Sequence, residues 1–299
     1  GQLAPLEFQA VGGPFGFGPF FVPPAAVTDS DLGSFLALEN TGTTTLSRRD
    51  VLTGPNDRLE NIAETLYLDV IYEGPGGLEV KNQLFYDATE NINENSYGFS
   101  QLIDSFVIED KFVVSKDFDF DFVEIAAQVS PSLRYTEFEQ ADDFDFEYFN
   151  RVDLTQGYDA RSDRLLSTES GGDFSGFVRG DYLNLAAAAL FDVEFDFGLN
   201  VLLGGRYDTI DAEATSIGRL TFADEDGNDV RDDDPDDRAQ DVEDALSWTA
   251  SVSYDLPFGI VPYATWSDQA VIIAGQGAEV TVGNLIDQTW ITSTELEEY

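Results

Sequence analysis

The chain has 299 residues, of which 42% are hydrophobic and 24% are charged, a composition typical of folded proteins rather than disordered ones. Acidic residues outnumber basic ones by 58 to 15, and the net charge of −43 repels nucleic-acid phosphates while it favours cations. The sequence contains no Cys and no His, which excludes disulfides, thiolate metal sites and catalytic triads that use His. We therefore expect no nucleic-acid partner and no enzymatic activity.

No stretch approaches the roughly 18 apolar residues of a transmembrane helix. The longest apolar run is Leu185–Phe191, and a membrane protein built from strands would show the same absence. The chain begins at Gly1, contains no Met and ends in the middle of a pattern at Tyr299. From this we expect an internal piece of a longer protein.

Residues 1–45 are rich in Gly, Pro and Phe and sustain no helical or strand period. We expect residues 1–60 to form a long loop that leads into the first strand, and residues 61–299 to form successive hairpins. Phe15, Phe17 and Phe20 are candidates for an aromatic ligand-capture loop, because rigid aromatic rings supply a large contact area. Packing of these rings within the loop is an equally good interpretation.

The first predicted hairpin shows the period of two that is typical of strands. Apolar side chains alternate with polar ones in Thr65–Tyr72 and again in Leu78–Asp87, where Asn82 is the one polar residue on the apolar face. The segment Glu73–Gly77 between them is rich in Gly and Pro and predicts a tight turn.

A polar link over Ala88–Leu102 precedes the second predicted pair of strands. Phe106–Lys116 runs outward, Asp117–Asp121 turns the chain, and Glu124–Phe138 returns. Pro131 weakens the returning strand as a central strand, because proline lacks a backbone N–H for the ladder.

Two more pairs follow with the same alternation. Leu183–Phe197 turns at Gly198 into Leu199–Asp208, and Leu246–Asp255 passes through a short turn into Ile260–Trp266.

Long acidic links separate these pairs, over about residues 139–180 and 210–245. The second contains Asp224–Asp244, with 12 acidic and two basic residues. Asp224, Asp226 and Asp229 are candidate Ca²⁺ ligands, because Ca²⁺ binds several carboxylate oxygens. The spacing does not match an EF-hand, and a solvated loop is the favoured alternative, so no cofactor is predicted beyond this possible Ca²⁺.

Short and long connections alternate along the whole chain, which is typical of an outer-membrane β-barrel with short periplasmic turns and long extracellular loops. In that architecture the apolar strand faces contact lipid and the polar faces line the lumen. Aromatic residues near the strand ends suit the girdles at the two lipid–water interfaces. These residues are Tyr72, Tyr86, Tyr135, Tyr207 and Tyr254. A soluble β-sandwich, with the apolar faces packed inward, remains the alternative.

Several segments resemble strands of the barrel domain of TonB-dependent receptors. Leu199–Asp208, which reads LNVLLGGRYD, is similar to the family strand L-x-L-x-x-G-x-R-Y-D. The hairpin at residues 248–267 is similar to the one that follows this strand in the family. Further segments resemble mid-barrel strands or the start of one. They are Asn82–Asp87, Ser96–Ser100, Glu109–Lys111 and Glu295–Tyr299.

The resemblance implies an all-β fold, an antiparallel transmembrane barrel of about 22 strands, of which this chain would supply about 8–10. It implies the cell outer membrane, contact with outer-membrane lipid, import of a scarce nutrient such as a ferric siderophore, and energy from the TonB complex. A plug domain, a TonB box and a closing C-terminal strand are not recognised in residues 1–299, so gating and coupling have no assigned residues here.

Arg134 and Arg206 fall on the polar faces of their strands and are the candidate lumenal residues for an anionic cargo. The favoured alternative is that they pair with lumenal carboxylates such as Asp208 or Asp69. Two other functions stay open: a soluble, secreted acidic module that binds glycan or Ca²⁺, and a passive porin.

Overall fold

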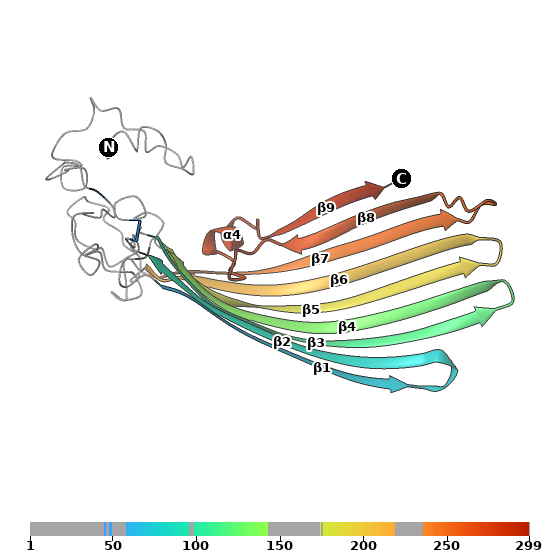
Figure 1. Ribbon diagram of the computed structural model, residues 1–299, viewed down its shortest axis with the longest axis horizontal. Helices are drawn as coiled ribbons and strands as arrows, with labels where there is room; N and C mark the ends of the chain where they lie inside the picture. Colours follow the sequence, from blue (N-terminus) through green and yellow to red (C-terminus); the bar gives the residue numbers. More distant parts are fainter. Residues whose placement is uncertain are drawn as a thin grey trace, which may run out of the picture.

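The computed structural model describes residues 45, 48–49, 58–95, 99–142, 174, 176–218 and 236–298. Nine strands in this part of the chain form one sheet, in which every strand pairs antiparallel with the next one along the sequence (Figure 1). They are β1 (Arg58–Glu73), β2 (Leu78–Asn95), β3 (Phe99–Phe120), β4 (Val123–Asp142), β5 (Gly176–Phe195), β6 (Leu199–Ser216), β7 (Asp237–Tyr254), β8 (Tyr263–Ile272) and β9 (Ile291–Glu298). The described helices are η2 (Pro75–Gly77) and α4 (Val282–Ile286), and neither has the length to cross a membrane.

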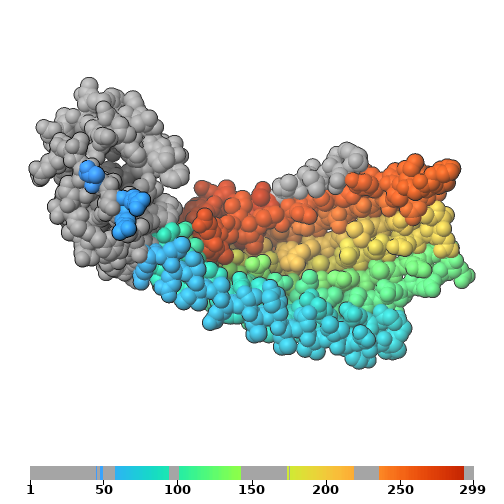
Figure 2. Space-filling view, viewed as in Figure 1, coloured from blue at the N-terminus to red at the C-terminus, as the bar shows by residue number. Residues whose placement is uncertain are grey.

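The sheet is open, since β1 and β9 are its two edges and do not pair with each other. The space-filling view shows the strands side by side in sequence order, from blue to orange (Figure 2). This is the expected partial barrel: an all-β, antiparallel meander whose described strand number lies within the predicted range. The sandwich alternative needs a second sheet over the apolar face, and the described residues form only this one.

The four predicted tight turns all lie at one end of the sheet (Figure 1). In two of these turns glycines supply a left-handed backbone: Gly76 and Gly77 have φ of 70° and 74°, and Gly198 has φ of 90°. An L side chain is strained at such angles, which explains why glycine stands at these corners.

The strands are longer than the sequence pattern predicts at the opposite end of the sheet. Ala88–Leu102 was expected to be a link, but β2 continues to Asn95 and β3 begins at Phe99, with the ladder paired throughout. At the tight-turn end, the predicted turn Asp117–Asp121 is also too long, because β3 continues to Phe120. In Ala88–Leu102 polar residues interrupt the apolar face, so there the hydrogen-bond ladder extends further than the alternation can reveal.

Pro131 interrupts one ladder, as predicted. The register between β3 and β4 runs to Lys111↔Ser132 and resumes at Val114↔Val129, with no paired residues between. On the other side of β4 the ladder with β5 is continuous and includes Pro131↔Ala187. Pro131 therefore interrupts the hydrogen-bond ladder with β3 locally, but β4 is still a central strand of the sheet.

The two faces of the sheet differ sharply. We call the face that carries α4 the inner face and the opposite one the outer face. Buried polar residues such as Ser130, Thr136 and Asn184 alternate with exposed apolar ones. Leu185, Leu203 and Leu246 on the outer face are 48%, 47% and 61% exposed. The predicted parity is thereby confirmed for the strands of β4 to β7.

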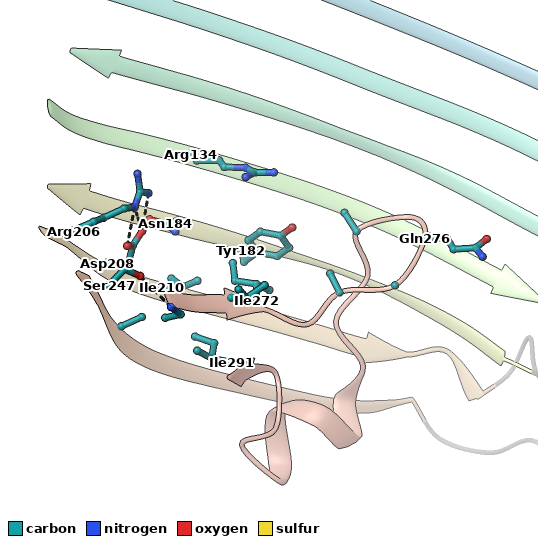
Figure 3. A pocket seen from close by; sticks show the side chains of 16 residues that line it. Arg134, Tyr182, Asn184, Arg206, Asp208, Ile210, Ser247, Ile272, Gln276 and Ile291 are labelled. Carbon is teal, nitrogen blue, oxygen red and sulfur yellow. Dashed lines mark hydrogen bonds and ion pairs between the residues drawn. The ribbon is translucent and has the colours of Figure 1, made fainter. Parts of the chain in front are cut away.

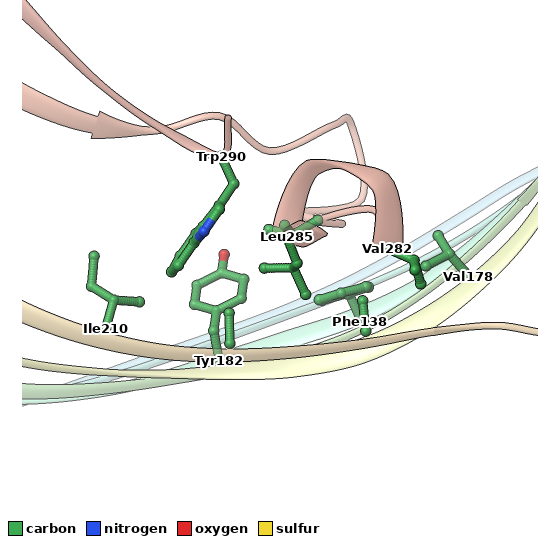
Figure 4. Close-up of a cluster of buried hydrophobic side chains, with 10 residues drawn as sticks. Phe138, Val178, Tyr182, Ile210, Val282, Leu285 and Trp290 are labelled. Atoms are coloured by element: carbon green, nitrogen blue, oxygen red, sulfur yellow. The ribbon is translucent and has the colours of Figure 1, made fainter. Parts of the chain in front are cut away.

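A hydrophobic cluster holds the segment between β8 and β9 against the inner face (Figure 4). Trp290 and Leu285 lie over Tyr182 and Ile210, while Val282 lies near Phe138 and Val178. Trp290 is fully buried, at 0% exposure. The largest core of the described residues is therefore on the polar side of the sheet, where a connecting segment folds back over it.

Candidate functional site

A cavity of about 540 Å³ lies on the inner face where the segment between β8 and β9 folds over the sheet (Figure 3). Six strands, β4 to β9, contribute to its wall, and residues 274–276 and 278 contribute to its rim. The side chains that line it are those of Arg134, Tyr182, Asn184, Arg206, Asp208, Ile210, Ala245, Ser247, Ala270, Val271, Ile272, Ala274, Gln276, Ala278 and Ile291, together with Gly275.

The rim of the cavity is anchored at several points. Residues 273–290 reach as far as β3, where Gln101 Nε2 donates to Gln276 Oε1 at 3.4 Å. Gly277 fits against Ile103, since a Cβ there would lie 2.8 Å from Ile103 Cγ2. At the other end, Trp290 Nε1 donates to Asp241 Oδ2 of β7 at 2.9 Å. This strap, residues 273–290, therefore crosses the inner face from β7 to β3.

Local sequence explains how the strap folds. Thr281 is the N-cap of α4, and its hydroxyl accepts a hydrogen bond from the backbone N–H of Asn284 at 3.1 Å. The Asn284 side chain in turn contacts Thr281 Oγ1 and donates to Thr289 Oγ1 at 3.1 Å. Capping of this kind satisfies backbone donors that would otherwise be unpaired. The short helix thus presents Val282 and Leu285 to the sheet.

Arg206 and Asp208 form a two-pronged ion pair beside the cavity (Figure 3). Arg206 Nε and Nη2 donate to Asp208 at 2.8 Å and 2.7 Å, and Asp208 is only 7% exposed. The two residues are next-but-one neighbours on β6, so both point to the inner face. The bidentate geometry fixes the guanidinium plane and leaves its Nη1 side directed away from Asp208.

Arg134 is different, because no ion pair or hydrogen bond of its side chain is found among the described residues. It stands directly across from Asn184 of β5 in the ladder. Asn184 is 8% exposed, and its Oδ1 is buried without a hydrogen-bond partner. Thr136 Oγ1, on the next inner-face position of β4, is also buried without a partner. Arg134 and the unsatisfied Asn184 Oδ1 therefore line the same cavity, whereas Thr136 is outside its lining, and Glu109 of β3 stands across from Arg134 on the other side of β4.

The structure brings the two predicted arginines to the same cavity. The predicted pairing with carboxylates is confirmed for Arg206 and does not hold for Arg134 within the described residues. Asp69 pairs instead with Lys81 of β2, at 2.8 Å. The other candidates lie outside the described residues, so their predicted roles stay predictions. They are Phe15, Phe17 and Phe20, and the possible Ca²⁺ ligands Asp224, Asp226 and Asp229.

The sequence analysis missed Asn184 and the strap. Strand parity places Asn184 on the polar face, but only the cross-strand register shows that Arg134 is its neighbour. For the strap, the spacing Thr281-x-x-Asn284 before Leu285 was a usable helix-start signal. Nothing local indicates that this helix folds back over the inner face of β5 and β6, because that depends on tertiary packing.

No family model and no curated protein matches the chain. Solved structures do resemble it at low identity. The ferric citrate transporter FecA in the unliganded form is 12% identical with a TM-score of 0.56, and the match covers 81% of this chain and 32% of that one. The ferric-catecholate import receptor Fiu from Escherichia coli K12, in its closed form, is 10% identical with a TM-score of 0.54, over 78% of this chain and 36% of that one. The siderophore receptor PiuA from Acinetobacter baumannii is 12% identical with a TM-score of 0.52, and the match covers 77% of this chain and 35% of that one.

These likenesses concern the fold. The chain spans about a third of the length of the structures that it matches. An open antiparallel meander with all its tight turns at one end, one apolar face and one polar face is a section of a large closed barrel. The sheet therefore has the fold of part of the β-barrel of the TonB-dependent receptors.

Proposed function

We propose that the chain is part of an outer-membrane, TonB-dependent receptor that binds a scarce nutrient and imports it, with an anionic ferric chelate such as a ferric siderophore as cargo. The observation that carries the proposal is the cavity beside Arg134, on the polar face of a sheet whose other face is apolar and exposed. The proposed cargo is a substrate, and no covalent step is involved.

The outer face supports a membrane location. Exposed leucines continue across β4 to β7, whereas soluble proteins rarely expose an apolar patch of this extent. The predicted girdle tyrosines fall at the edges of this apolar band: Tyr72 and Tyr254 are next to the short turns, and Tyr86, Tyr135 and Tyr207 mark the other edge. Rings with a polar tip suit an interface between lipid and water.

The inner cavity supports an anionic cargo with hydrogen-bonding groups. Within a chain of net charge −43, Arg134 supplies a guanidinium that has no ion pair or hydrogen bond among the described residues, with Glu109 as its ladder neighbour on β3. Asn184 Oδ1 accepts and Arg134 donates, which suits a chelate that carries both hydroxyl and carboxylate or catecholate oxygens. The titles of the structural neighbours name siderophore, ferric citrate and ferric-catecholate ligands for those proteins.

A gated receptor is favoured over a passive porin by the strap, which is packed over the inner wall and narrows the space beside it. Coupling to TonB would require a plug, and no residue of this chain is assigned to that role. A soluble module that binds glycan or Ca²⁺ is the remaining alternative, and the exposed outer face argues against it.

The test has two stages. The full-length protein should need detergent to stay in solution and should reconstitute into liposomes that remain impermeable to small solutes. In detergent, ferric citrate and a ferric catecholate should quench tryptophan fluorescence on binding, and Arg134→Ala should weaken binding by about tenfold. Arg179→Ala is the matched control, since Arg179 lies on β5 but on the outer face. Solubility in plain buffer, free diffusion of solutes, or equal binding by both variants would contradict the proposal.

A further inference from the structure

The cavity beside the strap has two polar ends on different strands of its wall (Figure 3). One end, on β4 and β5, carries Arg134 and Asn184, which are partners in the ladder. The other end, on β6 and β7, carries Arg206 and Ser247, which are also ladder partners. Because neighbouring strands lie about 4.8 Å apart, the backbones that carry the two arginines are separated by about 10 Å across the sheet.

Both ends are rich in hydrogen-bond donors. The Arg134 guanidinium makes no ion pair or hydrogen bond with another described residue. Arg206 uses Nε and Nη2 on Asp208 and keeps Nη1 for a ligand. Ser247 Oγ accepts the backbone N–H of Ala270 at 3.0 Å, so its own O–H can be donated to a ligand. Each end therefore offers one guanidinium, and a hydroxyl donor stands beside the second one.

The lining offers little aromatic surface. Its one aromatic residue, Tyr182, is 4% exposed, and its ring packs against that of Phe138 with the ring centroids 6.3 Å apart. The larger apolar side chains that remain in the lining are aliphatic, as in Ile210, Val271 and Ile272. A flat ring of a ligand would find no open aromatic face to stack on among these residues.

We propose that the cavity takes a ferric hydroxycarboxylate, a chelate with free carboxylates at opposite ends, in preference to a ferric catecholate. This inference rests on the proposed function and names the class of cargo for the same site. A ferric ion has fewer coordination positions than two citrate molecules have oxygen ligands, so carboxylates remain free on either side of the metal. One free carboxylate binds Arg134 and the opposite one binds Arg206 and Ser247, because a guanidinium donates two parallel hydrogen bonds to a carboxylate.

The other groups of the lining agree with this class. Asn184 Oδ1, the buried acceptor without a partner, suits a hydroxyl or a protonated carboxyl group of the chelate. A cavity of about 540 Å³ is within the usual range of small-molecule sites. In a tris-catecholate complex the oxygens all bind the metal and the periphery consists of ring edges, which neither accept from the donors nor find a ring to stack on. Selection therefore depends on free carboxylates and not on the total charge of the chelate.

Equilibrium dialysis of the full-length protein in detergent tests the proposal with three anionic chelates. They are ferric citrate, the ferric complex of a citrate monoester in which a free carboxylate is blocked, and ferric tris-catecholate. Ferric citrate should bind about tenfold more tightly than either of the others. Ser247→Ala should reduce this preference by about threefold, because one hydrogen bond to the carboxylate is lost. Arg206→Lys should also reduce it, since lysine keeps the charge but loses the two-pronged geometry.

Ser251→Ala is the matched control for Ser247→Ala. Ser251 lies on the same strand and the same face but outside the cavity lining, where its Oγ is 2.9 Å from Thr265 Oγ1. This variant should keep the full preference for ferric citrate.

The contrary outcomes are distinct. Equal binding of the three chelates, or tighter binding of the catecholate, overturns the proposed class of cargo and leaves a receptor for anionic ferric chelates intact. A preference for ferric citrate that Ser247→Ala and Arg206→Lys leave unchanged overturns its assignment to this cavity. If none of the three chelates bound to the unmodified protein, the proposed function itself would be contradicted.

Discussion

Trp290, the last residue of the strap, donates its indole N–H to the Asp241 carboxylate of β7 at 2.9 Å, and this contact lies at the edge of the largest hydrophobic cluster. The tryptophan is fully buried, so both its ring and its single donor are satisfied. A connecting segment of 18 residues is thus joined to the wall of the sheet by apolar packing and by a charged hydrogen bond.

We expect Trp290→Ala to detach the strap, because it removes the ring from the cluster and leaves Asp241 without this donor. Burial of a Trp ring contributes about 3–5 kcal/mol relative to Ala. Hydrogen exchange of residues 273–290 should become much faster, while exchange in β1 and β2 should change little. Trp248→Ala is the control, since Trp248 is 43% exposed on the outer face and touches no part of the strap cluster. Unchanged exchange in the strap of Trp290→Ala would refute its anchoring role.

The fold was largely predictable from alternation, because the strands between the girdle residues have one apolar and one polar face. Leu199–Asp208 illustrates this: its parity, its partner strands and the turn at Gly198 all follow from the sequence. The strand ends opposite the tight turns were not predictable, since both faces are polar there. Asp181 and Glu213, for example, are polar residues on the outer face. There the backbone ladder continues without the hydrophobic signal that reveals it.

The candidate site was predictable only in part. Parity placed Arg134 and Arg206 on the polar face, and the i, i+2 spacing of Arg206 and Asp208 allowed their pairing to be predicted. The contact between Arg134 and Asn184 depends on the register of β4 against β5, across a long link. The strap was missed because its helix is short, and its position is set by side chains of four other strands.

Gly180 should not tolerate even a methyl group. A Cβ at this position of β5 would lie 2.0 Å from the Glu213 carbonyl oxygen and 2.8 Å from Phe138 Cζ. Gly180→Ala must therefore displace β6 or the Phe138 ring under the strap, and we expect a loss of about 1–3 kcal/mol in the free energy of unfolding. Gly205→Ala is a matched control, because its Cβ would meet nothing nearer than 4.0 Å. Urea unfolding of both variants in detergent micelles compares them, and equal stabilities would contradict the close packing.

Acidic residues crowd the outer ends of the strands beyond the apolar band. Asp181 pairs across the ladder with Glu137 on one side and Glu213 on the other. Partial burial, followed by the charges of Glu213, Glu137 and Asp211, raises the pKa of Asp181 above its ordinary value. A raised carboxyl pKa means that the folded state holds the proton more tightly than the unfolded one. Stability from this group is therefore present at acidic pH and is lost as pH rises through that pKa.

Asp181→Asn should consequently stabilise the outer ends of β4, β5 and β6 at pH 7, by about 0.5–1 kcal/mol for two like-charged cross-strand pairs. The gain should shrink as pH falls through the raised pKa of Asp181, below which the carboxyl of the parent protein is protonated, and should shrink with added salt. Hydrogen exchange of these strand ends is the measurement. Asp192→Asn on the same strand serves as control, since its ladder partners Ala126 and Leu202 are uncharged. A gain that does not depend on pH would exclude charge repulsion as its cause.

We expect Asn184 to destabilise the unliganded protein and to strengthen the binding of a ferric chelate. Its Oδ1 is buried beside the cavity without a partner, and such an acceptor destabilises the folded state by about 1–2 kcal/mol. Asn184→Leu keeps a similar volume and removes the unsatisfied oxygen, so we expect the unliganded protein to resist urea better. Binding of ferric citrate or a ferric catecholate, followed by fluorescence quenching, should at the same time weaken by about tenfold. Asn200→Leu, on the inner face of β6 beside the turn and outside the cavity lining, should leave binding unchanged. If Asn184→Leu gained stability without losing affinity, the unpartnered oxygen would belong to the architecture of the wall and not to the recognition of cargo.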